Sequence, residues 1–348
     1  MPFELRYSAV DGCFVLQEYD PPALGPRLVR ARTVLAAPKH GTELRLWQAS
    51  AFRGRRWDAR LRLFLDNEGA PPIPPPSMAV GNMGVAVITE VGPAVQGLAP
   101  GDCVYGYMPV REVQTLDAAQ VRPLGGMAPE DAVCVDPAHV ALVAVRDGQV
   151  RLGDWVAVFG LGAIGLMTVQ AARASGATRV LAVDPLGPRR ERALALGAER
   201  AFDPSGQDVA LAIRQATRLD GVDVALEVSG ADASLREAIR SVRQCGTVVA
   251  VAWGHGDGRG LYLGEEFHVN RPTLVASQAV WANPDRDHPR WNEARAQTTC
   301  ADLFASGRFT SRGVLDPVVS LREAPDVLDA VFHDPGRVLK VGVRFATP

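Results

Sequence analysis

The second half of the chain alternates short apolar runs with segments in which apolar residues recur at helical spacing. The apolar runs are WVAVFG at 155–160, RVLAVD at 179–184, VDVALEVSG at 222–230, TVVAVA at 247–252 and a shorter one at 273–277. The helical pattern occupies the segments between them, at 163–175, 188–196, 209–218 and 233–242. Short apolar strands alternating with helices are typical of a parallel sheet covered on both faces. From about residue 149 the pattern therefore predicts a doubly wound α/β domain.

The first 148 residues follow a different pattern, with many prolines and glycines and short runs of β-forming residues. One such run is 84–91, which is followed by the turn Pro100-Gly101-Asp102 and a strand at 103–107. Short strands between turn signals predict an irregular, partly barrel-like β domain. After 277 a polar stretch leads to a helix at 291–306, a strand at 317–320, a helix at 324–332 and a last strand at 338–345.

Composition and charge narrow the classes of function. The 348 residues suggest two domains, and 47% hydrophobic with 22% charged residues is ordinary for a globular protein. Because 37 Lys and Arg residues nearly balance 39 Asp and Glu residues, no basic surface is expected to hold nucleic acid. The most apolar stretch, 155–169, is shorter than the roughly 18 residues of a membrane helix. We expect neither nucleic acid nor a membrane as a partner.

The N-terminal segment and the cysteines bear on the compartment. Glu4, Arg6 and Asp11 stand where a signal peptide would need an apolar core, so we expect a cytoplasmic protein. The five cysteines are scattered and form no C-x-x-C motif, which argues against a disulfide framework and a structural zinc knuckle.

A glycine-rich loop follows the strand at 155–160 and opens the next helix. It reads Gly160-Leu161-Gly162-Ala163-Ile164-Gly165, which fits G-x-G-x-x-G in the strand-to-helix context that a dinucleotide site requires. The first glycine permits the tight turn, the second admits a pyrophosphate at the helix N-terminus, and the third lets helix and strand pack closely. The predicted cofactor-binding residues of this loop are Gly160, Gly162, Ala163, Ile164 and Gly165.

An acid ends the next strand. Asp184 lies nineteen residues after Gly165 and is placed to accept both hydroxyls of the adenosine ribose. A 2′-phosphate would face this carboxylate, so the sequence favours NAD over NADP as the cofactor. Arg189 and Arg190 leave an alternative open, because either could neutralise such a phosphate or simply belong to a solvated helix face.

Several motifs together resemble the medium-chain dehydrogenase/reductase superfamily over nearly the whole chain. They are PGDCV at 100–104, GLGAIG at 160–165, Asp184, ALGAE at 195–199, DVALEVSG at 223–230 and CGTVVAV at 245–251. The resemblance implies a Rossmann NAD-binding domain at 149–281 and a GroES-like β-rich catalytic domain formed by 1–148 and 282–348. It also implies that Val228 and Ser229 belong to the cofactor site.

The chain departs from the zinc enzymes of that superfamily at two of the three expected metal-ligand motifs. Where those enzymes carry a C-G-T-D-like motif, this sequence has His40-Gly41-Thr42-Glu43, and their G-H-E motif is replaced by Gly81-Asn82-Met83. Asp136, before Pro137, remains acidic, and His139 is a further candidate ligand or a buried helix residue. Because catalytic zinc normally needs three protein ligands, we predict a zinc-independent enzyme with no bound metal.

Without zinc, side chains must move the proton and stabilise the alkoxide of a hydride transfer. The resemblance places Thr42 where the family carries a proton-relay hydroxyl, with Lys39 and His40 beside it. A histidine near its natural pKa and a desolvated lysine both suit acid/base chemistry at neutral pH. The predicted catalytic residues are Lys39, His40, Thr42 and Asp136.

The resemblance assigns two further positions. Glu43 matches an acid that pairs with a cation near the C-terminal strand, here Lys340, which would also lie near the pyrophosphate. The polar segment 265–278 belongs either to the ligand crevice or to a subunit interface at the sheet edge. We expect a homodimer through that edge.

The resulting hypothesis is a zinc-independent, NAD-dependent oxidoreductase that interconverts a secondary alcohol and a ketone. Because the candidate residues are polar, a sugar, polyol or cyclitol is the favoured small-molecule substrate. The alternatives are a quinone or enoyl reductase of the same superfamily and a non-catalytic nucleotide-binding protein.

Overall fold

The computed structural model describes residues 1–39, 41–43, 55–66, 77–253, 256–278, 285–334, 336 and 338–346. The chain packs as two compact units, which are treated separately below. The β-rich unit comprises Met1–Cys134 and Leu315–Pro348, and the parallel-sheet unit comprises Val135–Val314. Among the described residues no helix combines the length and the apolar character that crossing a membrane requires.

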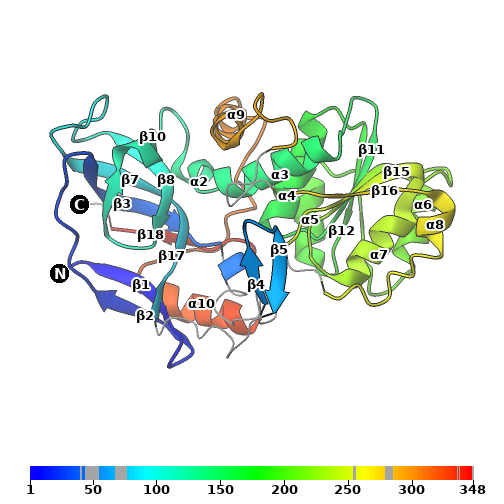
Figure 1. Ribbon diagram of the computed structural model, residues 1–348, viewed down its shortest axis with the longest axis horizontal. Helices are drawn as coiled ribbons and strands as arrows, with labels where there is room; N and C mark the ends of the chain where they lie inside the picture. Colours follow the sequence, from blue (N-terminus) through cyan, green and yellow to red (C-terminus); the bar gives the residue numbers. More distant parts are fainter. Residues whose placement is uncertain are drawn as a thin grey trace. The chain divides into compact units, whose positions relative to one another are not determined.

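The parallel-sheet unit contains one six-stranded sheet in the order β13-β12-β11-β14-β15-β16, with every neighbouring pair parallel (Figure 1). Its strands are β11 (Trp155–Phe159), β12 (Arg179–Val183), β13 (Arg200–Phe202), β14 (Val222–Glu227), β15 (Val242–Ala250) and β16 (Thr273–Ala276). In chain order this is 3-2-1-4-5-6, the arrangement of a doubly wound dinucleotide-binding fold. The predicted fold class is confirmed.

Helices cover both faces of this sheet (Figure 1). The helices of this unit are α3 (Val135–Asp147), α4 (Ala163–Ala174), α5 (Gly187–Ala195), α6 (Val209–Ala216), α7 (Asp232–Ser241), α8 (Glu266–Asn270) and α9 (Glu293–Ala305), of which α9 packs on α3. Helices α4 and α5 pack together, as do α6 and α7. Because β11 and β12 are apolar on both sides, Phe159 and Leu181 come together with Ile213 of α6 in a buried core.

The β-rich unit is built on a seven-stranded sheet and a three-stranded sheet. The larger contains β3 (Leu28–Ala37), β7 (Gly81–Val91), β8 (Cys103–Pro109), β9 (Val113–Asp117), β10 (Val121–Pro123), β17 (Val318–Ser320) and β18 (Gly342–Arg344). The smaller contains β1 (Phe3–Ser8), β2 (Cys13–Glu18) and β6 (Ser77–Ala79). The C-terminal chain returns to this unit, because Val343 of β18 pairs antiparallel with Ala36 of β3.

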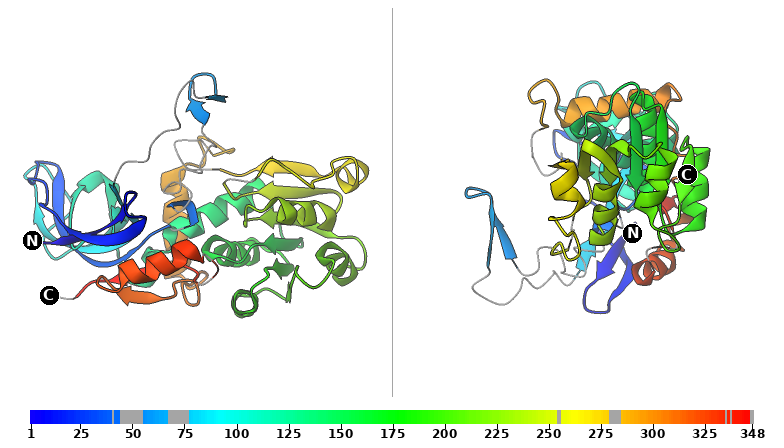
Figure 2. Two further views of the ribbon diagram at one scale, coloured as in Figure 1. Left: turned by 90° about the horizontal axis from the view of Figure 1, so that it is seen from below. Right: turned by 90° about the vertical axis from the view of Figure 1, so that its right-hand side faces the viewer.

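Short helices complete the β-rich unit: the 3₁₀ turn η2 (Ala118–Gln120), α2 (Pro129–Ala132) and α10 (Ala324–His333). Helix α10 packs on β2 (Figure 1), where the Asp329 carboxylate accepts a hydrogen bond from Phe14 N at 2.9 Å. Strands β4 (Arg55–Asp58) and β5 (Leu63–Asp66) form a separate hairpin that pairs with no other described strand (Figure 2).

Element boundaries differ from the sequence expectation where caps and bulges intervene. Helix α9 begins at Glu293 rather than 291 because the Asn292 side chain accepts a hydrogen bond from Arg295 N and caps the helix there. Strand β15 begins at Val242, five residues earlier than expected, because its pairing with β14 is interrupted by a register shift. The last strand keeps only Gly342–Arg344 of the expected 338–345.

The packing also divides the chain differently from the expected domains. Helix α3 packs on α4 and α9, so residues 135–148 and the segment through 314 group with the parallel sheet. From the sequence, both segments are assigned to the catalytic domain. The pattern of a helix that precedes the first strand does not indicate which sheet the helix packs against. The functional boundaries at 148/149 and 281/282 stay a prediction.

Candidate active site

The glycine loop joins β11 to α4 and has the geometry of a nucleotide-binding turn. Gly160 has φ +89°, and a Cβ there would lie 2.7 Å from both N and Cβ of Ser229. A Cβ on Gly165 would lie 1.9 Å from the carbonyl oxygen of Gly160. Around Gly162, by contrast, no heavy atom lies within 4 Å of the place where a Cβ would stand. The first and third glycines are therefore required by packing, whereas the second leaves space open at the helix N-terminus.

The five loop residues predicted for cofactor binding all lie at this turn: Gly160, Gly162, Ala163, Ile164 and Gly165. Gly162 is the N-cap of α4 and supplies no side-chain hydrogen bond to the first backbone N–H groups. Free N–H groups at a helix N-terminus attract anionic groups such as a pyrophosphate.

Asp184 follows β12 and reaches the glycine loop. The residue is 3% exposed, and its Oδ2 accepts a hydrogen bond from Leu161 N at 2.8 Å. Its Oδ1 accepts one from Leu186 N at 2.9 Å. Two backbone donors thus fix the carboxylate beside the loop, as the order of strand, loop, helix and acid predicts.

The two arginines after Asp184 lie in different surroundings. Arg189 approaches the acid, with 3.8 Å between its Nη1 and Asp184 Oδ2. The Nη1 of Arg190 donates to the backbone oxygen of Asp184 at 2.7 Å and forms an ion pair with Asp203 at 3.0 Å. Arg189 is therefore the arginine whose guanidinium lies near the predicted ribose-binding carboxylate.

A buried acid supports the loop from the neighbouring strand. Glu227, at the end of β14, is fully buried, and its Oε1 accepts hydrogen bonds from the backbone N and the hydroxyl of Ser229. Val228 N donates to the carbonyl oxygen of Phe159 at 2.8 Å. Val228 and Ser229 therefore lie directly against the glycine turn. Sequence reasoning assigned no role to Glu227, although an acid ending an apolar strand was a usable signal.

In the β-rich unit, two of the predicted acid/base residues, Lys39 and Thr42, lie on a turn that follows β3. Residues 41–43 form a helical turn, in which Thr42 N and Glu43 N both donate to the carbonyl oxygen of Lys39, at 2.9 and 3.0 Å. His40 lies outside the described residues. Lys39 and Thr42 are thus brought onto one short turn.

Glu43 fixes this turn to the start of β7. One carboxylate oxygen accepts from Lys39 N at 2.9 Å and the other from Gly81 N at 3.0 Å. Burial raises the pKa of this carboxyl to about 7, against the opposing effect of these hydrogen bonds and of the Lys340 and Lys39 charges. Lys340 is 3% exposed, and its Nζ donates to the carbonyl oxygen of Pro38 at 3.2 Å. Glu43 and Lys340 therefore stabilise the same turn.

Asn82 and Met83 occupy the next two positions of β7. The last pair of the β3–β7 ladder joins Ala37 to Met83, so Asn82 lies just past the end of β3, beside the turn. Met83 is buried, and the amide oxygen of Asn82 is buried without a hydrogen-bond partner among the described residues.

Asp136 and His139 lie on α3 in the parallel-sheet unit and are buried there. Burial, with a smaller contribution from the charge of Asp136, raises the pKa of the Cys300 thiol to about 12. Asp136 thus lies within electrostatic reach of Cys300 on α9.

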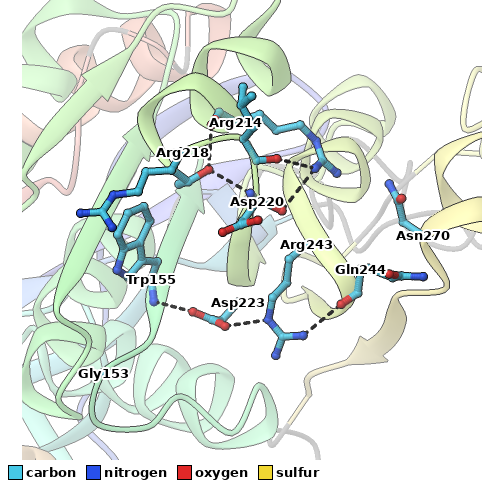
Figure 3. Close-up of a pocket in the computed structure, with 12 residues that line it drawn as sticks. Gly153, Trp155, Arg214, Arg218, Asp220, Asp223, Arg243, Gln244 and Asn270 are labelled. Atoms are coloured by element: carbon cyan, nitrogen blue, oxygen red, sulfur yellow. Dashed lines mark hydrogen bonds and ion pairs between the residues drawn. The ribbon is translucent and has the colours of Figure 1, made fainter.

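A hollow of about 520 Å³ lies at the amino ends of β11, β14 and β15, opposite the end that carries the glycine loop (Figure 3). Its charged groups are largely satisfied by one another and by the backbone. Asp223 accepts from Trp155 N at 2.8 Å and from Arg243 Nε at 2.7 Å, and Arg214 donates to backbone carbonyl oxygens such as that of Val242. None of the predicted site residues that the structure describes lines this hollow.

Comparison with known proteins places the chain among dehydrogenases. Residues 163–282 match the family model described as zinc-binding dehydrogenase. The chain is 36% identical over 338 residues to the D-guloside 3-dehydrogenase of Escherichia coli K12, and the match covers 95% of this chain and 96% of that protein.

Two solved structures share the fold. The 2R,3R-butanediol dehydrogenase from Bacillus subtilis superposes with a TM-score of 0.76 at 22% identity, covering 99% of each chain. A Sinorhizobium meliloti 1021 protein whose structure holds NADP gives a TM-score of 0.76 at 22% identity, also covering 99% of each chain. At this identity the two structures bear on the fold alone.

The family model begins after β11 and covers none of the positions where zinc ligands are expected, Asn82, Met83 and Asp136 among them. The near full-length relative extends the relationship to both units. The chain is an oxidoreductase and belongs to the medium-chain dehydrogenase/reductase superfamily, among its alcohol and polyol dehydrogenase-like members.

Proposed function

We propose that this protein oxidises a secondary hydroxyl of a sugar glycoside or a related polyol to the ketone, with NAD⁺ as the hydride acceptor and without catalytic zinc. The relationship to a D-guloside 3-dehydrogenase over 95% of the chain carries the proposal. A D-guloside, oxidised at its third carbon, is therefore the first substrate to test.

The residues around the glycine loop fit a nicotinamide dinucleotide. The space beside Gly162 admits a pyrophosphate, which the N–H groups of α4 would hold. Asp184 would accept hydrogen bonds from the ribose hydroxyls, while its negative charge would repel a 2′-phosphate. The bound nicotinamide supplies the site that accepts or donates hydride. Arg189, 3.8 Å from Asp184, is the group that would have to offset this repulsion for NADP to bind.

The turn after β3 supplies the groups for proton transfer. Removal of hydride from an alcohol requires that its hydroxyl proton pass to a base. Thr42 would relay this proton, with Lys39 or His40 as the terminal base, and Asp136 stays the fourth predicted catalytic residue. Glu43 keeps Lys39 and Thr42 in fixed geometry by joining Lys39 N to Gly81 N.

The side chains at the positions of the expected metal ligands argue against a catalytic zinc. Zinc in proteins is bound by thiolate, imidazole and carboxylate groups, whereas Asn82 offers a neutral amide and Met83 a buried thioether. Within the described part of the chain, no three His, Cys, Asp or Glu side chains gather where they could hold a metal ion. Zinc independence is accordingly part of the proposal.

The test is oxidation of methyl D-guloside, followed by the absorbance of NADH and by mass spectrometry of the ketone. A panel of other glycosides, polyols and cyclitols defines the substrate class. Reduction of quinones or enones, with no alcohol oxidised, would contradict the proposal.

Zinc independence has its own test. Activity should survive dialysis against a chelator, and Lys39→Ala or Thr42→Ala should lower kcat by about 10²-fold if the residue takes part in proton transfer. Zinc bound in one equivalent per chain, with activity lost on chelation and restored by zinc, would overturn this part.

A further inference from the structure

The amide of Asn82 is incompletely bonded within the protein. Its Oδ1 is buried and accepts no hydrogen bond from any residue that the structure describes. A buried amide oxygen without a donor costs about 1–3 kcal/mol, and few such groups occur in native proteins. Because a carbonyl oxygen can only accept, the missing partner is a donor, either a hydroxyl or an N–H group.

The position of this oxygen indicates which donor is missing. Asn82 directly follows Gly81, whose backbone N is held by the Glu43 carboxylate. That same carboxylate holds Lys39 N, on the turn that carries Thr42. The unsatisfied acceptor therefore stands next to the residues assigned to proton transfer, where a hydroxyl-rich substrate would bring donors.

We propose that Asn82 is a substrate-binding residue whose Oδ1 accepts a hydrogen bond from a sugar hydroxyl other than the one that is oxidised. The proposal rests on the proposed function. The reacting hydroxyl must give its proton to a base, and an amide oxygen is too weak a base for that task. A site built to bond a hydroxyl rejects analogues that lack it, because its own polar group is then left unpaired.

The experiment pairs Asn82→Leu with analogues of methyl D-guloside in which each non-reacting hydroxyl in turn is replaced by fluorine, which cannot donate. For the wild type, one analogue should lose about tenfold or more in kcat/KM. Asn82→Leu should lose a similar factor with the parent glycoside, mostly through a higher KM, and should treat that analogue and the parent alike.

Thr115→Val is the matched control. The Thr115 hydroxyl oxygen, on β9 of the same unit, is also buried without a partner among the described residues, and β9 pairs with β3 at the end remote from the turn. This variant should discriminate between the parent glycoside and its fluorinated analogues as the wild type does. Both substitutions remove an unsatisfied oxygen, so neither should lower Tm.

The outcomes separate this inference from the function on which it rests. Wild-type protein that oxidises no glycoside refutes the proposed function and this inference with it. If the wild type oxidises glycosides and Asn82→Leu discriminates between the analogues as the wild type does, the role of Asn82 is refuted and the proposed function stands. A lower Tm for Asn82→Leu with unchanged discrimination shows that Asn82 serves the fold, which also overturns the proposal.

Discussion

At the scale of single residues, the preference for NAD(H) over NADP(H) is predicted from Asp184. The carboxylate is held by two backbone donors beside the glycine loop, so a 2′-phosphate cannot displace it without breaking those bonds. We expect NAD(H) to bind at least about tenfold more tightly than NADP(H), a difference of about 1.4 kcal/mol. Asp184→Ala should narrow this ratio in fluorescence titrations.

Glu199→Ala is the control for that measurement. Glu199 pairs with Arg179 at the amino end of β12, whereas Asp184 follows the other end of that strand, so the loss of Glu199 should leave the cofactor ratio unchanged. Equal affinities of the wild type for both cofactors would refute the assignment of Asp184.

The raised pKa of Glu43 leads us to expect that the stability of the protein depends on pH. Burial raises its pKa from 4.5 to about 7, so between these values the folded chain binds more protons than the unfolded chain. Its contribution to stability is full below about pH 4.5 and is lost as pH rises to about 7, by at most about 3 kcal/mol. The Tm of the wild type, measured relative to that of Glu43→Gln, should therefore fall between about pH 5 and pH 8.

Glu130→Gln is the control, because the pKa of Glu130 is shifted in the opposite direction from that of Glu43. The hydrogen bond from Arg344 lowers the pKa of Glu130, so this group contributes stability that is lost only below its ordinary pKa of 4.5. The Tm difference between wild type and Glu130→Gln should stay flat over the range in which the Glu43 difference changes. Parallel behaviour of the two variants would count against the assignment to Glu43.

The residues that sequence reasoning located and those that it missed differ in one physical respect. Asp184 and the glycines are linked by a local order of strand, loop, helix and strand, which the sequence displays. The bond from Gly81 to Glu43 joins residues 38 apart, and it depends on the register of β3 against β7, which no local pattern specifies. The unsatisfied oxygen of Asn82 likewise emerges only from its three-dimensional surroundings.

At the scale of elements, the turn from β11 to α4 separates glycines needed for packing from the glycine needed for binding. A side chain on Gly162 would enter open space, whereas one on Gly165 would collide with the Gly160 carbonyl. Gly162→Val should therefore fold with an unchanged Tm but lose at least about tenfold in NADH affinity. Gly165→Val should lower Tm before any effect on binding can be measured.

Thermal unfolding and NADH fluorescence titration of the two variants, made side by side, check this contrast. Wild-type affinity in Gly162→Val would mean that the open space beside this glycine is not where the dinucleotide binds.

The sequence predicted the order and type of elements in the parallel-sheet unit because strand and helix periods differ clearly there. Boundaries were less predictable, as the cap at Asn292 and the register shift within β15 illustrate. These features depend on single side chains and on pairing with a neighbour, neither of which alters the hydrophobic period.

At the scale of the whole molecule, the edge strand β16 carries the prediction of a homodimer. Among the described strands it pairs only with β15, and Leu274 on it is 43% exposed. An uncovered strand edge favours association with a second copy of the same strand. We expect a dimer by light scattering at micromolar concentration, which Leu274→Lys should weaken.

Leu211→Lys makes the same substitution at a residue that is 50% exposed on helix α6, and it should leave the dimer intact. A wild-type monomer, or equal effects of the two lysines, would contradict an interface at β16.

The discontinuous β-rich unit has a consequence for how the chain is made. The parallel-sheet unit is one unbroken segment, Val135–Val314, so it can fold before the residues that follow Val314 have been synthesised. Strand β3 precedes this segment in the chain, whereas its partner β18 and the lysine that bonds Pro38 follow it. Until β18 has been synthesised, the Leu35–Ala36 end of β3 can pair only with β7. The turn that carries Lys39 and Thr42 thus reaches its final form only after β18 and Lys340 have been made, when the dinucleotide fold can already be complete.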